Sequence, residues 1–112
     1  MKNYKSLHRK RSGTSFKGYA IEPYHRIVEI FGEPNSSGDG YKVDIEWVID
    51  TPYGVATIYN YKDGKAYLGN RGLEIQDITD WHIGGKNDLV CIYINARLKG
   101  MEVSVRGLTN QL

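Results

Sequence analysis

A stretch of alternating apolar and polar residues from position 42 to 49 constrains the fold of this chain more than any other feature. Every second residue in it is apolar, namely Val43, Ile45, Trp47 and Ile49. Because successive side chains of a strand point to opposite faces, the pattern predicts a strand that buries Trp47 and leaves Asp44 and Lys42 on the other face. Residues 55–61 are rich in β-branched and aromatic residues and follow a turn at 51–54, so they predict the antiparallel partner.

A helix is predicted over residues 22–31. Pro23 suits the first helical position, where its missing N–H costs nothing, and Gly32 can end the helix. Four apolar residues repeat at the i, i+3, i+4, i+7 spacing of one helical face: Tyr24, Ile27, Val28 and Phe31.

The other predicted strands are short. Asp63-Gly64 is a strong two-residue hairpin signal, so the residues after it are expected to return as a third strand. In chain order, these strands are predicted at 14–19, 65–68, 81–83 and 101–106.

Residues 88–99 are ambiguous, because Val90 and Ile92 favour a strand whereas Cys91, Ile94 and Leu98 follow a helical stripe. We predict a helix. The predicted fold class is therefore α+β: a small antiparallel meander sheet with one or two helices packed on one face.

Charge divides the chain into a flexible basic arm at 1–12 and a single domain at 13–112. Residues 1–17 carry six Lys or Arg and no acid, whereas residues 18–112 carry nine Lys or Arg and thirteen Asp or Glu. The lone Cys91 favours a reducing compartment. No apolar run approaches the roughly 20 residues of a membrane span, and no signal-peptide pattern is present, so a cytoplasmic protein is expected.

No nucleophile elbow, P-loop or dinucleotide fingerprint occurs, so neither a catalytic residue nor a cofactor is predicted. The three histidines and the single cysteine lack the spacing of metal ligands, and no metal site is predicted. One enzymatic alternative stays open: a small hydrolase that uses His82 with Asp77 or Asp80.

Candidate binding residues gather at two places, the end of the second hairpin strand and the segment from 81 to 86. Tyr and Trp rings stack on bases, but they also serve as protein-interface anchors or fill a core. Backbone amides at Gly84-Gly85, ahead of a helix, can meet an anion. The predicted ligand-binding residues are Lys42, Tyr59, Asn60, Tyr61, Lys62, Trp81, His82, Gly84 and Gly85.

Six short motifs form a distinctive set: GTSFKGY at 13–19, FGEP at 31–34, GDGYKVD at 38–44, EW at 46–47, TIYNYK at 57–62 and WHIGG at 81–85. Through them, residues 13 to about 98 resemble a group of small proteins encoded by bacteriophages and prophages. The resemblance implies a context and no particular activity: an accessory protein that counters a host defence in the cytoplasm of the infected bacterium.

In that context, the first hypothesis is a protein that sequesters a nucleotide-like or other anionic small molecule, in a pocket at a homo-oligomer interface. The second is a direct inhibitor that docks on a host or defence protein through an aromatic surface. Sequence-specific nucleic-acid binding is not expected, because no reading element accompanies the basic arm.

Overall fold

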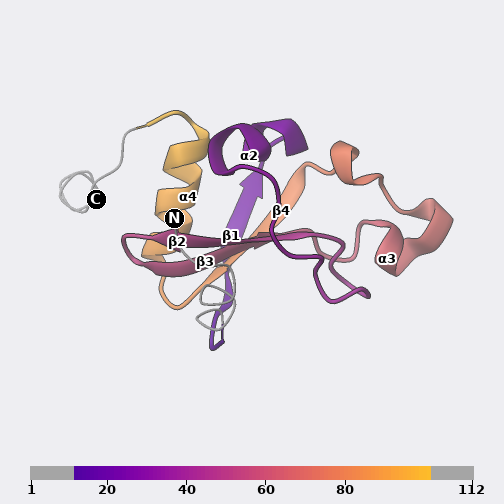
Figure 1. Ribbon diagram of the computed structural model, residues 1–112, viewed down its shortest axis with the longest axis horizontal. Coiled ribbons are helices and arrows are strands. Elements are labelled where there is room, and N and C mark those ends of the chain that lie inside the picture. Colours follow the sequence, from indigo (N-terminus) through magenta and orange to yellow (C-terminus); the bar gives the residue numbers. More distant parts are fainter. Residues whose placement is uncertain (1–11, 102–112) are drawn as a thin grey trace.

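The computed structural model describes residues 12–101, which form a four-stranded sheet with helices beside it (Figure 1). In chain order, the elements are β1 (Ser15–Ile21), α2 (Tyr24–Phe31), β2 (Glu46–Thr51), β3 (Gly54–Tyr59), α3 (Lys65–Leu68), the 3-10 helices η1 (Gly69–Arg71) and η2 (Ile75–Asp77), β4 (Asp80–Gly85) and α4 (Leu89–Leu98). The strand order is β1-β4-β3-β2, and every neighbouring pair is antiparallel. The predicted α+β class is confirmed. Apart from Ser12 and Met101, the predicted arm and the predicted last strand lie outside the described residues.

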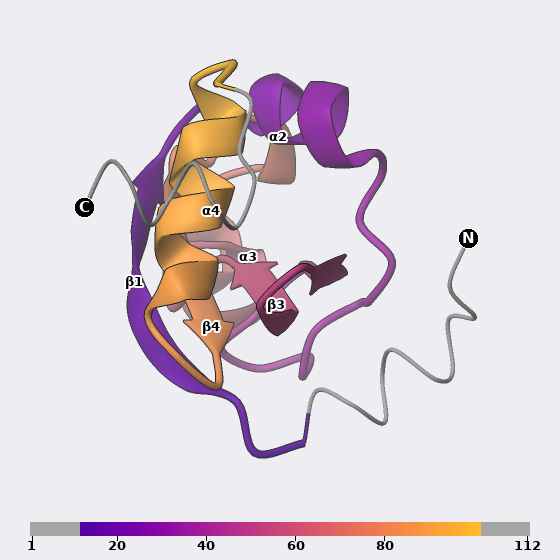
Figure 2. The ribbon, with the colours of Figure 1, turned by 90° about the vertical axis from the view of Figure 1, so that its left-hand side faces the viewer.

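Helices α2 and α4 lie on the same side of the sheet (Figures 1 and 2). Three residues of α4 are buried, Val90, Ile94 and Leu98, and they share one core cluster with Trp47 and Trp81 of the sheet. The helix predicted at 88–99 is therefore confirmed, because burying this stripe outweighs the β propensity of its branched residues. No helix within residues 12–101 has both the length and the apolar character needed to cross a membrane.

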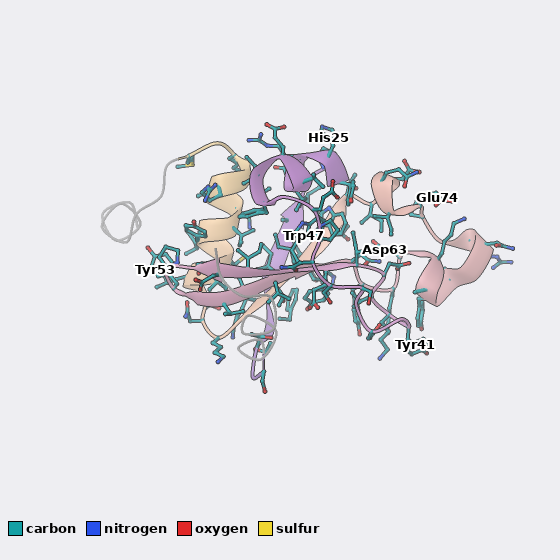
Figure 3. The ribbon with its side chains drawn as sticks, in the orientation of Figure 1. His25, Tyr41, Trp47, Tyr53, Asp63 and Glu74 are labelled. Carbon is teal, nitrogen blue, oxygen red and sulfur yellow. The ribbon has the colours of Figure 1, made fainter. Side chains whose placement is uncertain are left out.

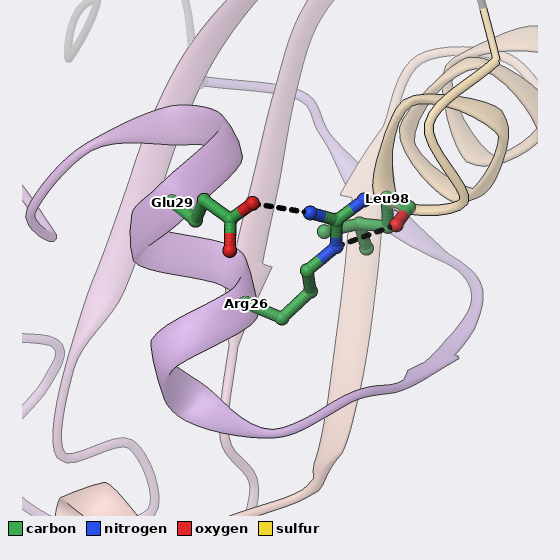
Figure 4. A network of polar contacts seen from close by, with 3 residues as sticks. All are labelled: Arg26, Glu29 and Leu98. Atoms are coloured by element: carbon green, nitrogen blue, oxygen red, sulfur yellow. Dashed lines mark hydrogen bonds and ion pairs between the residues drawn. The ribbon is translucent and has the colours of Figure 1, made fainter.

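Arg26 of α2 connects the two helices (Figure 4). Its Nε donates a hydrogen bond to the carbonyl oxygen of Leu98 at 2.9 Å, and its Nη1 lies 2.7 Å from the carboxylate of Glu29. Since the last carbonyls of a helix lack partners within it, Arg26 satisfies one of them at the end of α4. This contact holds α2 against α4 on one side of the sheet.

Strand register sorts the side chains of the sheet onto two faces. Trp47 of β2 pairs with Ile58 of β3, and both are buried in the core with the helices. At the next position, Tyr59 of β3 pairs with His82 of β4, which pairs in turn with Tyr19 of β1. Because neighbouring residues of a strand alternate, this second row lies on the face turned away from α2 and α4, called here the far face.

Residues 65–68 form α3, so the third strand predicted after Asp63-Gly64 is wrong. The carboxylate of Asp44 accepts a hydrogen bond from the backbone N–H of Ala66 at 3.0 Å, in the first turn of this helix. Gly64 also forms a parallel bridge with Leu73. These distant contacts outweigh the local hairpin preference. β2 begins only at Glu46, so Asp44 lies before the strand and not on its solvent face.

Candidate functional site

Four aromatic rings surround the imidazole of His82 on the far face. Their centroids lie 5.0 Å (Tyr19), 5.1 Å (Phe16), 5.1 Å (Tyr61) and 5.5 Å (Tyr59) from that of His82. These five residues line a pocket of about 330 Å³, called here the aromatic pocket. Phe16, Tyr19 and Tyr61 are 48%, 56% and 37% exposed. Exposed rings around a hollow are typical of a binding site.

A β-bulge in β1 brings Phe16 and Tyr19 to the same face. Phe16 pairs with Gly84 of β4, whereas Gly18 pairs with the residue just before Gly84, so Lys17 is an extra residue in this strand. Without a bulge, two residues three positions apart would point to opposite faces. Neither ring is among the binding residues predicted from the sequence, because a bulge is set by strand pairing. The only local signal is the glycine between them.

The two glycines predicted to meet an anion are part of the sheet. Gly84 pairs with Phe16 on one side and with Thr57 on the other, so its backbone lies within the hydrogen-bonded sheet and is not presented to an anion. A Cβ on Gly84 would lie 2.6 Å from Thr57 Oγ1, and a Cβ on Gly85 would collide with Val90 of α4. Close packing therefore explains both glycines, and Gly85→Asp would disrupt the fold.

Trp81 lies on the opposite face of β4 from His82 and is fully buried. Its Nε1 donates a hydrogen bond to the carbonyl oxygen of Glu22 at 2.9 Å, and its ring meets Trp47 edge to face at 5.2 Å. The predicted stacking role of Trp81 is therefore wrong, because strand alternation sends only one of two adjacent rings to the far face.

Asn60 is also fully buried, and hydrogen bonds occupy its amide group. Its Oδ1 accepts from the backbone N–H groups of Asp44 (2.8 Å) and Ile45 (3.2 Å). Its Nδ2 donates to the carboxylates of Asp44 (2.7 Å) and Asp63 (3.1 Å). Asn60 is therefore a positioning residue that joins the segment before β2 to the segment after β3, and it does not contact a ligand as predicted.

A second group of rings lies beside the aromatic pocket. The ammonium of Lys62 sits 5.3 Å from the ring centre of Tyr61 and 5.4 Å from that of Tyr67, in the range of cation–π contacts. Tyr67 meets Tyr41 at 5.4 Å, and the Lys62 N–H donates to the carbonyl oxygen of Lys42 at 2.8 Å. The predicted residues Lys42 and Lys62 thus lie together, next to a pair of rings, Tyr41 and Tyr67, that is not among the predicted binding residues.

A polar hollow adjoins the aromatic pocket and shares Tyr59 with it. It has a volume of about 440 Å³ and is lined by Gly38, Asp39, Val43 and Glu46 besides Tyr59. The carboxylate of Asp39 accepts three backbone hydrogen bonds of 2.8–2.9 Å from residues 41–43, which lower its pKa below the ordinary value. Tyr59 therefore separates an apolar hollow from one bordered by carboxylates.

Burial controls the protonation of the two rings at the centre of the site. It lowers the pKa of His82 below its ordinary value of 6.5, although the carboxylates of Asp80 and Asp63 act in the opposite direction. Burial, with Glu46 nearby, raises the pKa of the Tyr59 hydroxyl. At neutral pH, both rings are therefore uncharged.

The stability of the domain should depend on pH through His82. Because burial lowers the imidazole pKa in the folded state, the unfolded chain takes up this proton first as the pH falls. Between about pH 8 and about pH 5, the wild type should therefore lose stability that His82→Phe retains. Urea unfolding of both proteins across this range measures the difference, which should be smallest at the alkaline end. Parallel losses in the two proteins would contradict it.

No protein-family model matches the chain, and neither a curated protein nor a solved structure is significantly similar to it. Within residues 12–101, no group of three or more His, Cys, Asp or Glu side chains is placed to hold a metal ion.

Proposed function

We propose that this protein binds a planar, nucleotide-like small molecule in the aromatic pocket and sequesters it without chemical change. The observation that carries the proposal is the ring of Phe16, Tyr19, Tyr59 and Tyr61 around His82, with a hollow of about 330 Å³ between them. Base–aromatic stacking contributes about 1–3 kcal/mol per base and tolerates any base, since every base has a π-face.

The polar groups near the rings complement the other parts of a nucleotide. Lys62 carries its charge beside Tyr61, where it can meet a phosphate while its stem covers the ring. Asp39 and Glu46 line the hollow on the other side of Tyr59, where carboxylates can accept hydrogen bonds from sugar hydroxyls. The uncharged His82 can stack and also exchange hydrogen bonds with a base edge.

The resemblance to bacteriophage and prophage proteins supports a role as an accessory factor that removes a nucleotide signal of host defence. Sequestration needs affinity and no catalytic group. Asp80 acts on His82 electrostatically, but in the described part of the chain neither Asp77 nor Asp80 forms the hydrogen bond with His82 that the hydrolase alternative needs. All five residues of the aromatic pocket come from one chain, so the proposal does not require the homo-oligomer expected from the sequence.

Calorimetric titration with the four ribonucleoside monophosphates tests this function. At least one should bind, and Tyr61→Ala should weaken that binding by about 1–3 kcal/mol through the loss of one stacking surface. Tyr53→Ala is the matched control, because Tyr53 lies in the turn between β2 and β3, far from Tyr41 along the longest axis of the molecule (Figure 3). The ligand should be recovered chemically intact after incubation.

A direct protein inhibitor is the second candidate, favoured by the exposure of Tyr19 and Tyr41, which are 56% and 58% accessible. Aromatic side chains on a surface are common interface anchors. If no nucleotide binds, and Tyr61→Ala nevertheless abolishes the biological inhibition, the aromatic surface contacts a protein and the sequestration proposal fails.

A further inference from the structure

Further aromatic rings lie beside the aromatic pocket. Lys62 lies between Tyr61, which lines the pocket, and Tyr67 of α3, with its ammonium 5.3 Å from one ring centre and 5.4 Å from the other. Tyr67 is 38% exposed and Tyr41 58% exposed, and their centroids are 5.4 Å apart. Figure 3 shows Tyr41 on the side of the sheet opposite α2. The molecule therefore carries two stacking surfaces with a cation between them.

We propose that the ligand is a dinucleotide: one base stacks in the aromatic pocket, the second stacks on Tyr67 and Tyr41, and the phosphate between them contacts Lys62. This inference rests on the proposed function and specifies its ligand class. Alternation of ring, cation and ring matches the order of base, phosphate and base in such a molecule. A mononucleotide would leave the second surface unused.

The backbone holds these parts in place. Lys62 has a left-handed backbone conformation, with a φ of 63°, which few residues other than glycine adopt. The hydrogen bond from its N–H to Lys42 and the buried amide of Asn60 hold this loop next to the segment 41–44. The surface between the two ring sites is thus formed before a ligand binds, which reduces the entropy lost on binding.

Charge supports an anion at Lys62. Among the described residues, neither Lys62 nor Lys42 forms a salt bridge, whereas Lys65 nearby is paired with Glu74 at 2.7 Å. The carboxylates closest in sequence are already engaged: Asp63 accepts from Asn60, and Asp44 accepts from Asn60 and Ala66. The two lysines are therefore available to a phosphate.

The charge of the described residues favours a small dinucleotide over a long nucleic-acid strand. Residues 12–101 carry nine Lys or Arg and twelve Asp or Glu. A polymer gains affinity by neutralising many phosphates in succession. Here two lysines lie beside the rings on an otherwise acidic body, which suits a ligand with one or two phosphates.

Calorimetry with three ligand sets tests the inference: ribonucleoside monophosphates, the linear and cyclic homodinucleotides of the same four bases, and longer single-stranded homopolymers. The best dinucleotide should bind at least about tenfold more tightly than its mononucleotide, the gain from one further stacking contact. Tyr67→Ala should remove that gain and leave mononucleotide binding unchanged. Tyr61→Ala should weaken both.

Lys62→Gln should weaken dinucleotide binding, and Tyr53→Ala should change neither ligand. Thermal unfolding of each variant shows whether an effect on binding comes from loss of the fold. If Tyr67→Ala leaves the dinucleotide affinity unchanged while mononucleotides bind, the two-base inference is wrong and the proposed function stands. If no ligand binds, the proposed function itself fails. If homopolymers bind more tightly than dinucleotides, with a steep salt dependence, the ligand is a longer single strand and the dinucleotide inference is wrong.

Discussion

Replacing Trp47 by alanine should lower the free energy of unfolding by about 3–5 kcal/mol, the range for removing a large buried aromatic side chain. Trp47 is 1% exposed and packs edge to face on Trp81 at 5.2 Å. Its Nε1 also donates a hydrogen bond of 2.8 Å to the carbonyl oxygen of Gly32, at the end of α2. The substitution therefore creates a cavity at the centre of the core and removes a contact that joins β2 to α2.

Urea or thermal unfolding measures this effect. The matched control is Tyr41→Ala, which removes another aromatic ring at a position 58% exposed and should change stability by less than about 0.5 kcal/mol. Similar losses from the two substitutions would mean that Trp47 is not a core residue and that the register of β2 is wrong.

Replacing Asn60 by alanine should lower the free energy of unfolding by about 2–4 kcal/mol, because it leaves several partly buried polar groups without partners at once. The backbone N–H groups of Asp44 and Ile45 lose their acceptor, and the carboxylates of Asp44 and Asp63 lose a donor. Asn60→Asp should also be destabilising although its shape is the same, since it places a third carboxyl group between Asp44 and Asp63.

Asn70→Ala is the matched control, because Asn70 is exposed in η1, and it should be close to neutral. Denaturant unfolding of the three variants is the measurement. A loss for Asn60→Ala no larger than for Asn70→Ala would show that the amide does not hold the segments before β2 and after β3 together. Asn60→Ala should also weaken ligand binding, since Tyr61 and Lys62 follow Asn60 directly and depend on the same loop being held in place.

These contacts change what is expected of Asp44. From strand alternation alone, Asp44→Ala should be almost neutral. In the structure, its carboxylate accepts hydrogen bonds from Asn60 and from the first turn of α3. We now expect a loss of roughly 1–3 kcal/mol, the cost of leaving such groups unpaired.

Part of the fold follows from local sequence patterns, although the third strand predicted at 65–68 does not form. Apolar periodicity is a local property, so it located α2, α4 and the β2–β3 hairpin, and it assigned Trp47 to the core. Tyr59, Tyr61, His82 and Lys62 are among the binding residues predicted from the sequence, and the structure does bring them together. These residues could be predicted because the sequence shows directly which aromatic, cationic and amide side chains lie near the end of a predicted strand.

Which of those residues share a surface depends on strand pairing and on long-range contacts in the folded chain. Trp81 and His82 are adjacent in the chain, yet pairing with β1 and β3 sends Trp81 into the core and His82 to the far face. Phe16 joins the aromatic pocket because a bulge shifts the register of β1. Asn60 and α3 depend on hydrogen bonds to Asp44, which is sixteen residues before Asn60. Strand register and long-range hydrogen bonds are set by the free energy of the whole fold, so no local pattern contains them.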